Sequence, residues 1–206
     1  MIVTPLWDVH PATPGSATSA SCRAPGAGRD NATMVRVLVT AWVCSLLAAC
    51  APELDWRELR LDPPGVSQLF PCKPSRQQRS AVVGGQERPL VLHVCDAGGA
   101  TWALSHFRVR TPLEVPAALD ALAAAAHANL GAARTEPREQ PVPGAGGYAA
   151  AGRYRISGHR PDGTALQSAL LLYARGTVVV QLTVLGPRLA DEAVAAFFAG
   201  ARASIP

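Results

Sequence analysis

The chain contains few aromatic residues and almost no lysine. Aromatic residues make up 5% and charged residues 17% of its 206 residues, and Lys73 is the sole lysine. The 19 basic and 15 acidic residues give a formal net charge of +4, and the basic residues are scattered without a run of Lys or Arg. A nucleic-acid-binding surface needs clustered basic side chains with aromatic rings among them. We therefore expect no nucleic-acid partner.

Apolar runs long enough to cross a membrane are also missing. The apolar run at 37–49 has 13 residues, whereas a transmembrane helix needs about 20 and the apolar region of a signal peptide has about 7 to 15. Arg36 precedes the run, and a polar segment beginning at Pro52 follows it. The run therefore predicts an export signal. The alternative is a buried core helix that happens to end in a cysteine.

Motifs for catalysis, metal binding or cofactor binding are not found. No serine has the Gly-x-Ser-x-Gly pattern of a hydrolase nucleophile. The glycine-rich segment 144–147 lacks the preceding strand and following helix that a phosphate-binding loop requires. None of the histidines after the apolar run has metal-binding spacing. These histidines are His93, His106, His127 and His159. We predict no catalytic residue, no cofactor site and no metal site.

The apolar run ends in Leu47-Ala48-Ala49-Cys50, which resembles the signal of bacterial lipoproteins. The resemblance implies that Cys50 receives a diacylglyceryl group, becomes the mature N-terminus and is then N-acylated, with fatty acids such as palmitate. Two or three acyl chains give stable membrane attachment, whereas one does not. Ala51 after the cysteine implies sorting to the outer membrane. The resemblance therefore predicts a protein of the bacterial envelope, anchored by lipid in the outer membrane and facing the periplasm.

The signal divides the chain into four segments. The first is rich in Pro, Ser, Thr, Ala and Gly and precedes an export signal that should begin a chain, so we interpret it as a misplaced translation start or a disordered leader. The remaining length suits one domain with a short tether. The predicted segments are the leader at 1–33, the signal peptide at 34–49, a lipid-bearing tether at 50–64 and a single domain at 65–206.

Two of the five cysteines remain for the folded domain. Cys22 precedes the signal, Cys44 leaves with it and Cys50 takes the lipid, which leaves Cys72 and Cys95. In a compartment that oxidises thiols, an even number of cysteines predicts a disulfide. A metal pair or a redox couple is the alternative, but the two cysteines lack Cys-x-x-Cys spacing.

Alternating apolar residues predict strands in two groups. The first group forms a meander at 66–70, 81–83, 90–95 and 101–110, with a turn at 96–99. The second group follows a long loop at 135–147 and comprises 148–156, 165–173 and 177–185. The last of these strands is apolar on both faces, which predicts a central position in the sheet.

Two helices complete the pattern. Thr111-Pro-Leu-Glu114 has the form of a capping box, and apolar residues recur at helical spacing from Val115 to Leu130. Gly131 predicts the end of this long helix. A second helix begins at Asp191, and Val194, Phe197 and Phe198 lie on one of its faces.

The predicted order of strands and helices resembles that of the PsbP-like group of α/β sandwiches. The resemblance is carried by the motif "LFPCKP" near the start of the domain and by "YARGTVVVQLTVLG" and "AVAAFFAGARAS" at its end. The resemblance covers 66–204. It implies an α+β fold in which an antiparallel β-sheet of about six or seven strands is covered by two main helices. These motifs are packing residues, so the resemblance carries no functional residue to this chain, and the group serves varied assembly, scaffold and binding roles.

Two functions remain as hypotheses. The first is a non-enzymatic module that binds another envelope protein or supports assembly, with the loop at 135–147 as its binding element; alternatively, this loop merely crosses the end of the sheet. The second is an enzyme or small-ligand binder with a pocket between the sheet and the long helix, walled by His93, Trp102 and His106, with His93 opposite Trp102. A protein-binding module should expose an apolar patch or mobile loop, whereas a ligand binder needs a concave site with convergent polar groups.

Overall fold

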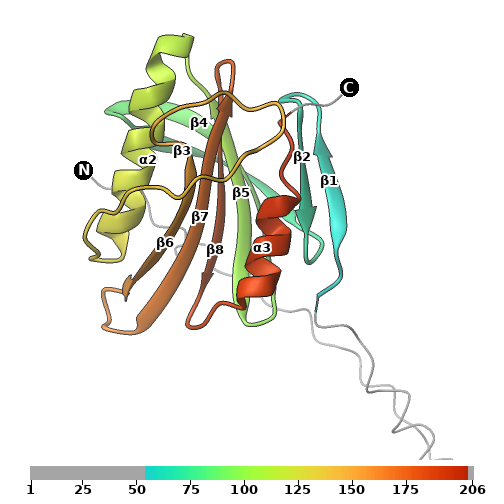
Figure 1. The fold of residues 1–206 in the computed structure, drawn as a ribbon, viewed down its shortest axis with the longest axis vertical. Helices are drawn as coiled ribbons and strands as arrows, with labels where there is room; N and C mark the ends of the chain where they lie inside the picture. The colour runs from blue at the N-terminus through green and yellow to red at the C-terminus, as the bar shows by residue number, and fades with distance from the viewer. Residues whose placement is uncertain (1–53, 204–206) are drawn as a thin grey trace, which may run out of the picture. The chain divides into compact units, whose positions relative to one another are not determined.

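Eight strands and two α-helices make up residues 54–203, the part of the chain that the computed structural model describes (Figure 1). The α+β class, with an antiparallel sheet and two helices, is confirmed. The elements are β1 (Arg57–Leu61), β2 (Val66–Phe70), β3 (Ser75–Val83), β4 (Gln86–Ala97), β5 (Ala100–Arg108), the 3₁₀ turn η2 (Pro112–Glu114), α2 (Val115–Asn129), β6 (Gly152–His159), β7 (Ala165–Arg175), β8 (Val178–Gly186) and α3 (Asp191–Ala199).

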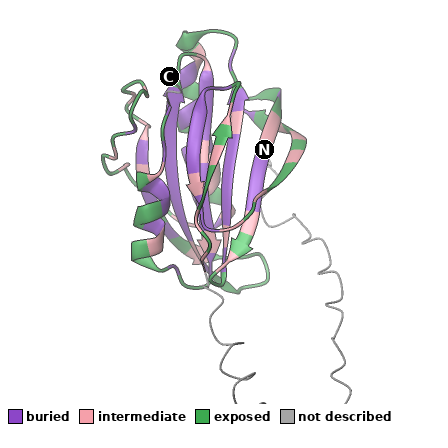
Figure 2. Ribbon diagram, turned by 90° about the vertical axis from the view of Figure 1, so that its right-hand side faces the viewer, coloured by how far each residue is buried: buried purple, intermediate pink, exposed green. Residues whose placement is uncertain are grey.

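Six strands form one sheet in which all neighbouring strands are antiparallel. Their order is β3-β4-β5-β8-β7-β6, so two three-stranded meanders meet where β5 pairs with β8. The central position predicted for the last strand is confirmed, because β8 lies between β5 and β7 and most of its residues are buried (Figure 2). β6 begins at Gly152 instead of Tyr148, since the preceding residues belong to the loop.

The two helices cover opposite faces of the sheet. Trp102 of β5 packs against Phe197 of α3, with ring centroids 5.2 Å apart. Tyr154 of β6 packs against His127 of α2, with ring centroids 5.8 Å apart. Across the sheet, Tyr154 is aligned with Ala103, so the two side chains point to the same face. Consecutive strand residues point to opposite faces, so Trp102 lies on the other face, together with α3. We call the two sides the α2 face and the α3 face.

β1 and β2 form a separate hairpin that packs on the α3 face (Figure 1). Phe70 of β2 meets Phe197 with ring centroids 5.4 Å apart, and Trp56, just before β1, meets Trp102 at 6.2 Å. The prediction of a tether through residue 64 is therefore wrong from Trp56 onward. The segment is charged because β1 exposes one side to water, while Leu59 on its other side packs against the core.

A disulfide joins this hairpin to the sheet. Cys72, two residues after β2, bonds to Cys95 of β4, and their Cα atoms are 6.1 Å apart. The pairing predicted from the cysteine count is therefore present. Hairpin and sheet share no strand pairing, and the disulfide adds a covalent link between β4 and the segment 71–74 that connects β2 to β3.

The start of the long helix differs from the predicted capping box. Thr111 makes no side-chain cap bond, and residues 112–114 form η2 before α2 begins at Val115. Glu114 is unavailable for capping because it accepts hydrogen bonds from Arg88 at 2.6 Å and from Arg110 at 3.2 Å. These two guanidinium groups lower the pKa of Glu114, with the Arg88 hydrogen bond as the largest cause.

The predicted lipidation of Cys50, the signal at 34–49 and the leader at 1–33 lie outside the described residues. Within 54–203, neither helix has the length and apolar character needed to span a membrane.

Candidate functional site

The loop between α2 and β6, residues 130–151, begins at a fixed anchor on α2. The ring of His127 donates from Nδ1 to the carbonyl of Ala123 at 2.8 Å, and its Nε2 accepts the backbone N–H of Thr135 at 3.2 Å. The hydroxyl of Thr135 lies 3.0 Å from the same Nε2. The buried histidine therefore holds the loop in place as it leaves the helix.

The loop then pairs with β6 through one pair of residues. Arg138 and Arg153 exchange two backbone hydrogen bonds, each of 2.8 Å. Gly152 permits this approach: its φ is +137°, and a Cβ atom there would lie 2.7 Å from the carbonyl oxygen of Arg138. In such a pair the Cα atoms are about 5.5 Å apart and both side chains point to the same face.

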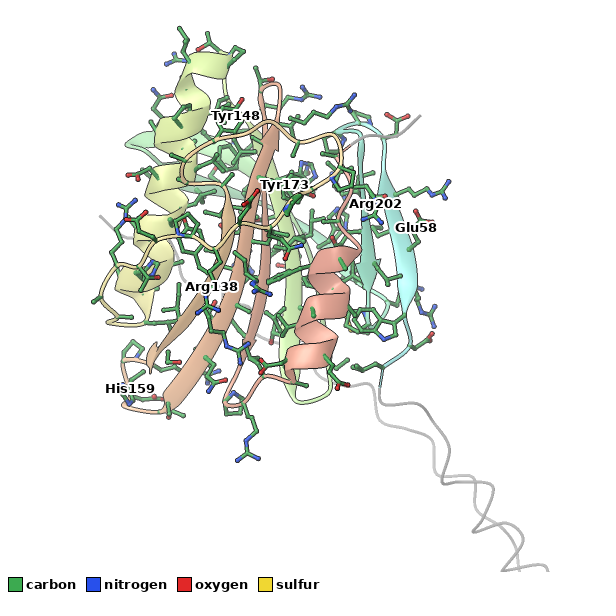
Figure 3. All side chains as sticks on the ribbon, in the orientation of Figure 1. Glu58, Arg138, Tyr148, His159, Tyr173 and Arg202 are labelled. Atoms are coloured by element: carbon green, nitrogen blue, oxygen red, sulfur yellow. A yellow bond between two sulfur atoms is a disulfide. The ribbon has the colours of Figure 1, made fainter. Side chains whose placement is uncertain are left out.

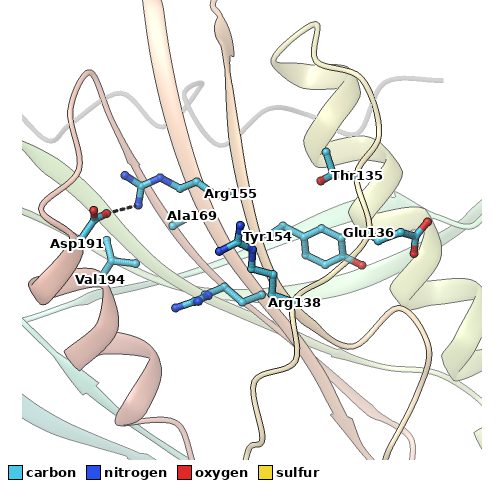
Figure 4. Close-up of a pocket in the computed structure, with 9 residues that line it drawn as sticks. Thr135, Glu136, Arg138, Tyr154, Arg155, Ala169, Asp191 and Val194 are labelled. Carbon is cyan, nitrogen blue, oxygen red and sulfur yellow. Dashed lines mark ion pairs between the residues drawn. The ribbon is translucent and has the colours of Figure 1, made fainter.

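That pairing creates an open cleft of about 600 Å³ on the α3 face, between the loop, β6, β7 and the start of α3 (Figure 4). We call it the arginine cleft. Its lining comprises Thr135, Glu136 and Arg138 from the loop, residues 153–155 from β6, Ala169 from β7, and Asp191 and Val194 from α3.

Three guanidinium groups line the arginine cleft, and one of them is neutralised. Arg155 forms an ion pair with Asp191 at 3.0 Å, drawn as a dashed line in Figure 4. Arg138 and Arg153 have no ion-pair partner among residues 54–203. Like charges directly opposite each other across a strand pair are destabilising. The cleft therefore keeps two adjacent positive charges that have no ion-pair partner among the described residues.

The remaining walls are apolar or already hydrogen-bonded. Ala169 and Val194 are buried and give the cleft an apolar side. The hydroxyl of Tyr154 donates to the carbonyl of Ala150 at 2.9 Å, and burial raises the pKa of this phenol. Glu136 is exposed and is the second carboxylate of the lining, besides Asp191. The cleft can therefore hold an anionic group through its arginines, while Tyr154 supplies surface only.

The second half of the loop lies over β7. Val142 is buried there, and the N–H of Gly146 donates to the carbonyl of Ala174 at 2.8 Å. A smaller cavity of about 310 Å³ lies between residues 139–148 and β7. Tyr173 contributes to its wall (Figure 3), but its hydroxyl is fully buried and burial raises its pKa. The loop thus crosses the sheet and also walls the arginine cleft.

His93, Trp102 and His106 do not line a pocket beneath the long helix. The register puts all three on the α3 face, opposite α2, so that part of the prediction is wrong. His93 pairs with Leu104, because the turn consists of Gly98 and Gly99 alone and shifts the register by two residues. Trp102 is 3% exposed and its indole donates to the carbonyl of Ala97. Trp102 belongs to the core, His93 is buried beside it on the same face, and His106 is half-buried.

The other predicted positions are dispersed. His127 anchors the loop, and His159 is exposed at the end of β6 (Figure 3). Among residues 54–203 no three His, Cys, Asp or Glu side chains are grouped so that they could hold a metal ion.

The grouping of the three arginines in the cleft was not predicted from the sequence. Arg138 is 15 positions from Arg153, and the two meet through a single loop-to-strand pair that no periodic pattern announces. The available signal was Arg153-x-Arg155, which puts two guanidinium groups on the same face of a strand.

Comparison with family models, with curated proteins and with solved structures found no match to this chain.

Proposed function

We propose that this chain is a lipid-anchored binding protein of the bacterial envelope and that its domain takes up an anionic ligand in the arginine cleft. The observation that carries the proposal is the pair Arg138 and Arg153, directly opposite each other and without a carboxylate partner among the described residues. Guanidinium groups bind carboxylates and phosphates through paired N–H donors. A bound anion would also remove the repulsion between the two arginines.

The small amount of exposed apolar surface favours a polar ligand over an apolar protein-binding surface. Among residues 54–203 the exposed large apolar side chains are Val82, 38% exposed on β3, and Leu113, 89% exposed in η2. Single apolar residues of this kind are common on protein surfaces and form no interaction patch.

The proposed role is binding, without catalysis. Of the two carboxylates in the cleft, Asp191 is engaged by Arg155, and Tyr154 donates its hydroxyl proton to a carbonyl. Guanidinium groups stay protonated and therefore serve as anion holders in preference to proton carriers.

The proposed location rests on the signal-like segment that ends at Cys50 and on Ala51 after it. The disulfide between Cys72 and Cys95 supports an oxidising compartment such as the periplasm. The relationship to the PsbP-like group, which the motifs suggest, remains a proposal about ancestry. It does not indicate which ligand the domain binds.

A second candidate function, binding of another envelope protein, is favoured by the free edge of β3. Within residues 54–203 this nine-residue strand pairs with β4 alone. An open edge can receive an extended segment of a partner as an additional strand. Photo-crosslinking in cells from Gln78, exposed on β3, should then capture a single partner, and crosslinking from Asp120, exposed on α2, should not.

The leading proposal is tested by calorimetric titration of the purified full chain with acetate and with inorganic phosphate. Saturable binding of at least one anion is expected, and the double variant Arg138→Gln/Arg153→Gln should abolish it. Arg160→Gln is the matched control, because Arg160 is an exposed arginine outside the cleft. Failure of both anions to bind, or equal binding by the double variant, would refute the proposal.

A further inference from the structure

The charge in the arginine cleft indicates which class of anion it suits. Asp191 forms an ion pair with Arg155, whereas Arg138 and Arg153 have no ion-pair partner among residues 54–203, although the exposed Glu136 also lines the cleft. We infer that the ligand of the cleft ends in a phosphate monoester, whose two negative charges match this pair; the inference rests on the proposed function. A carboxylate carries one charge and would leave one guanidinium uncompensated.

The number of acceptor atoms points the same way. Each arginine offers a planar fork of N–H donors, and one fork suffices to occupy both oxygens of a carboxylate. A phosphate monoester has three terminal oxygens, so it can accept from two forks simultaneously. The backbones of Arg138 and Arg153 are hydrogen-bonded to each other and both residues line the cleft, so both forks are within reach of one ligand there.

The flanking groups limit the ligand to one terminal phosphate. In Figure 4, Asp191 and Glu136 lie on opposite sides of Arg138. Both carboxylates line the cleft, and Glu136, which has no ion-pair partner among residues 54–203, would repel further negative charges along a polyanion. Ala169 and Val194, which are almost fully buried, close the cleft on its apolar side.

The same terminal phosphate could come from a soluble organic phosphate or from the headgroup of a lipid in the membrane that carries the proposed anchor. Both sources present the same dianion to the cleft. The cleft is open and Arg138 is exposed to solvent, so a ligand from either source can reach it. Separate arms of the experiment therefore distinguish the two sources.

The first arm compares phenyl phosphate with benzoate and succinate by calorimetric titration of the full chain at pH 7.5 and pH 5.0. Phenyl phosphate should bind at least tenfold more tightly than benzoate or succinate at pH 7.5. It should lose about tenfold in affinity at pH 5.0, because its second proton binds near pH 6. Benzoate should change little, because carboxylates titrate near pH 4.

Substitutions link this preference to the two arginines. Arg138→Gln and Arg153→Gln should each weaken phenyl phosphate binding at least tenfold, since each removes a charge-assisted fork. Arg160→Gln should leave the affinity unchanged, and thermal unfolding of all three variants checks their folding. Benzoate or succinate binding as tightly as phenyl phosphate, or phenyl phosphate affinity independent of pH, would overturn the phosphate inference and leave anion binding standing. Absence of binding by every anion would overturn the proposed function itself.

The second arm uses the Cys50→Ser variant, which lacks the proposed lipid, with phosphatidylcholine vesicles that contain phosphatidic acid or phosphatidylglycerol. Retention on phosphatidic acid alone, reversed by phenyl phosphate, identifies a lipid headgroup as the source. Tight phenyl phosphate binding without retention identifies a soluble phosphate. Both results support a terminal phosphate monoester, whereas equal retention on phosphatidylglycerol, a phosphate diester with one charge, contradicts it.

Discussion

The imidazole rings of His93 and His106 stack on the α3 face with centroids 6.3 Å apart and planes within 15° of parallel. His93 is 5% exposed, and its Nε2 has no hydrogen-bond partner among the described residues. Burial, followed by the repulsion that a protonated ring would meet from His93, Arg76 and Arg108, lowers the pKa of His106 from 6.5 to about 4. Burial and Arg76 lower the pKa of His93 as well. Both rings are therefore neutral at neutral pH.

The first prediction follows from that depressed pKa. Because the unfolded chain takes up this proton near pH 6.5 and the folded chain only near pH 4, stability falls as the pH drops through this window. The titration of His106, a half-buried ring that solvent partly screens, should lower the free energy of unfolding by about 1 to 2 kcal/mol between pH 7 and pH 5. Urea unfolding at the two pH values should show this loss in the wild type and a smaller loss in His106→Gln. His159→Gln, at an exposed position, is the control, and an unaltered pH dependence in His106→Gln would contradict the prediction.

Reduction of the disulfide should destabilise the domain. Cys72 and Cys95 are 23 positions apart, and closing a loop of this length contributes about 3 kcal/mol on the chain-entropy argument. Urea unfolding with and without dithiothreitol measures the effect, and the Cys72→Ser/Cys95→Ser variant should not respond to the reductant. Thiol labelling of the unreduced, denatured protein should leave both cysteines unmodified; labelled thiols there would refute the disulfide.

Gly158 of β6 should tolerate no larger residue. A Cβ atom at this position would lie 1.9 Å from the carbonyl oxygen of Leu130, which follows α2. Gly158→Ala must push the end of the helix away from the sheet, which should cost about 2 to 4 kcal/mol of unfolding free energy. Gly147→Ala is the control, since nothing lies within 4 Å of a Cβ atom there. Equal melting temperatures of the two variants would contradict this packing.

Gly152 should be important for ligand binding although it does not line the arginine cleft. A Cβ atom on Gly152 would meet the carbonyl oxygen of Arg138 at 2.7 Å, and its φ of +137° disfavours any other residue. Gly152→Ala should therefore separate Arg138 from Arg153 and weaken anion binding about tenfold or more. The titration described for the cleft measures this, with Gly147→Ala as the matched variant. Unchanged affinity would mean that the loop-to-strand pair does not position Arg138.

Cys50→Ser should release the protein from the membrane fraction and slow its processing, because the proposed acyl chains have no other attachment point. Cys44→Ser, within the proposed signal, should remain membrane-bound after processing. Fractionation and intact-mass measurement test both variants. A wild-type protein without acyl groups, or a membrane-bound Cys50→Ser protein, would contradict the lipid anchor.

Periodic patterns predicted the sheet and helices because they repeat over many residues. The apolar pattern of β8 and the helical spacing from Val115 to Leu130 arise because the buried residues of these elements are apolar. Such patterns are visible in the local sequence. The strand β1 escaped prediction because its outward residues are charged and Pro63 and Pro64 follow it closely. The disulfide was predictable by elimination, since two cysteines remained for the domain.

The arginine cleft could not be predicted in this way. It depends on one contact between Arg138 and Arg153 and on the conformation of Gly152, and neither leaves a repeat in the sequence. Likewise, the partner of His93 was missed because a two-residue turn at Gly98 and Gly99 fixes the register, whereas Asp96 also favours turns and suggested a four-residue turn.

Because β1 begins at Arg57, the proposed anchor at Cys50 would limit the reach of the domain. Four peptide units separate Cys50 from Leu54, and four fully extended residues span at most about 14 Å. With acyl chains on Cys50, Leu54 would stay within that distance of the bilayer surface. A domain held so close meets chiefly molecules that diffuse along or next to the membrane, so the search for a ligand becomes nearly two-dimensional.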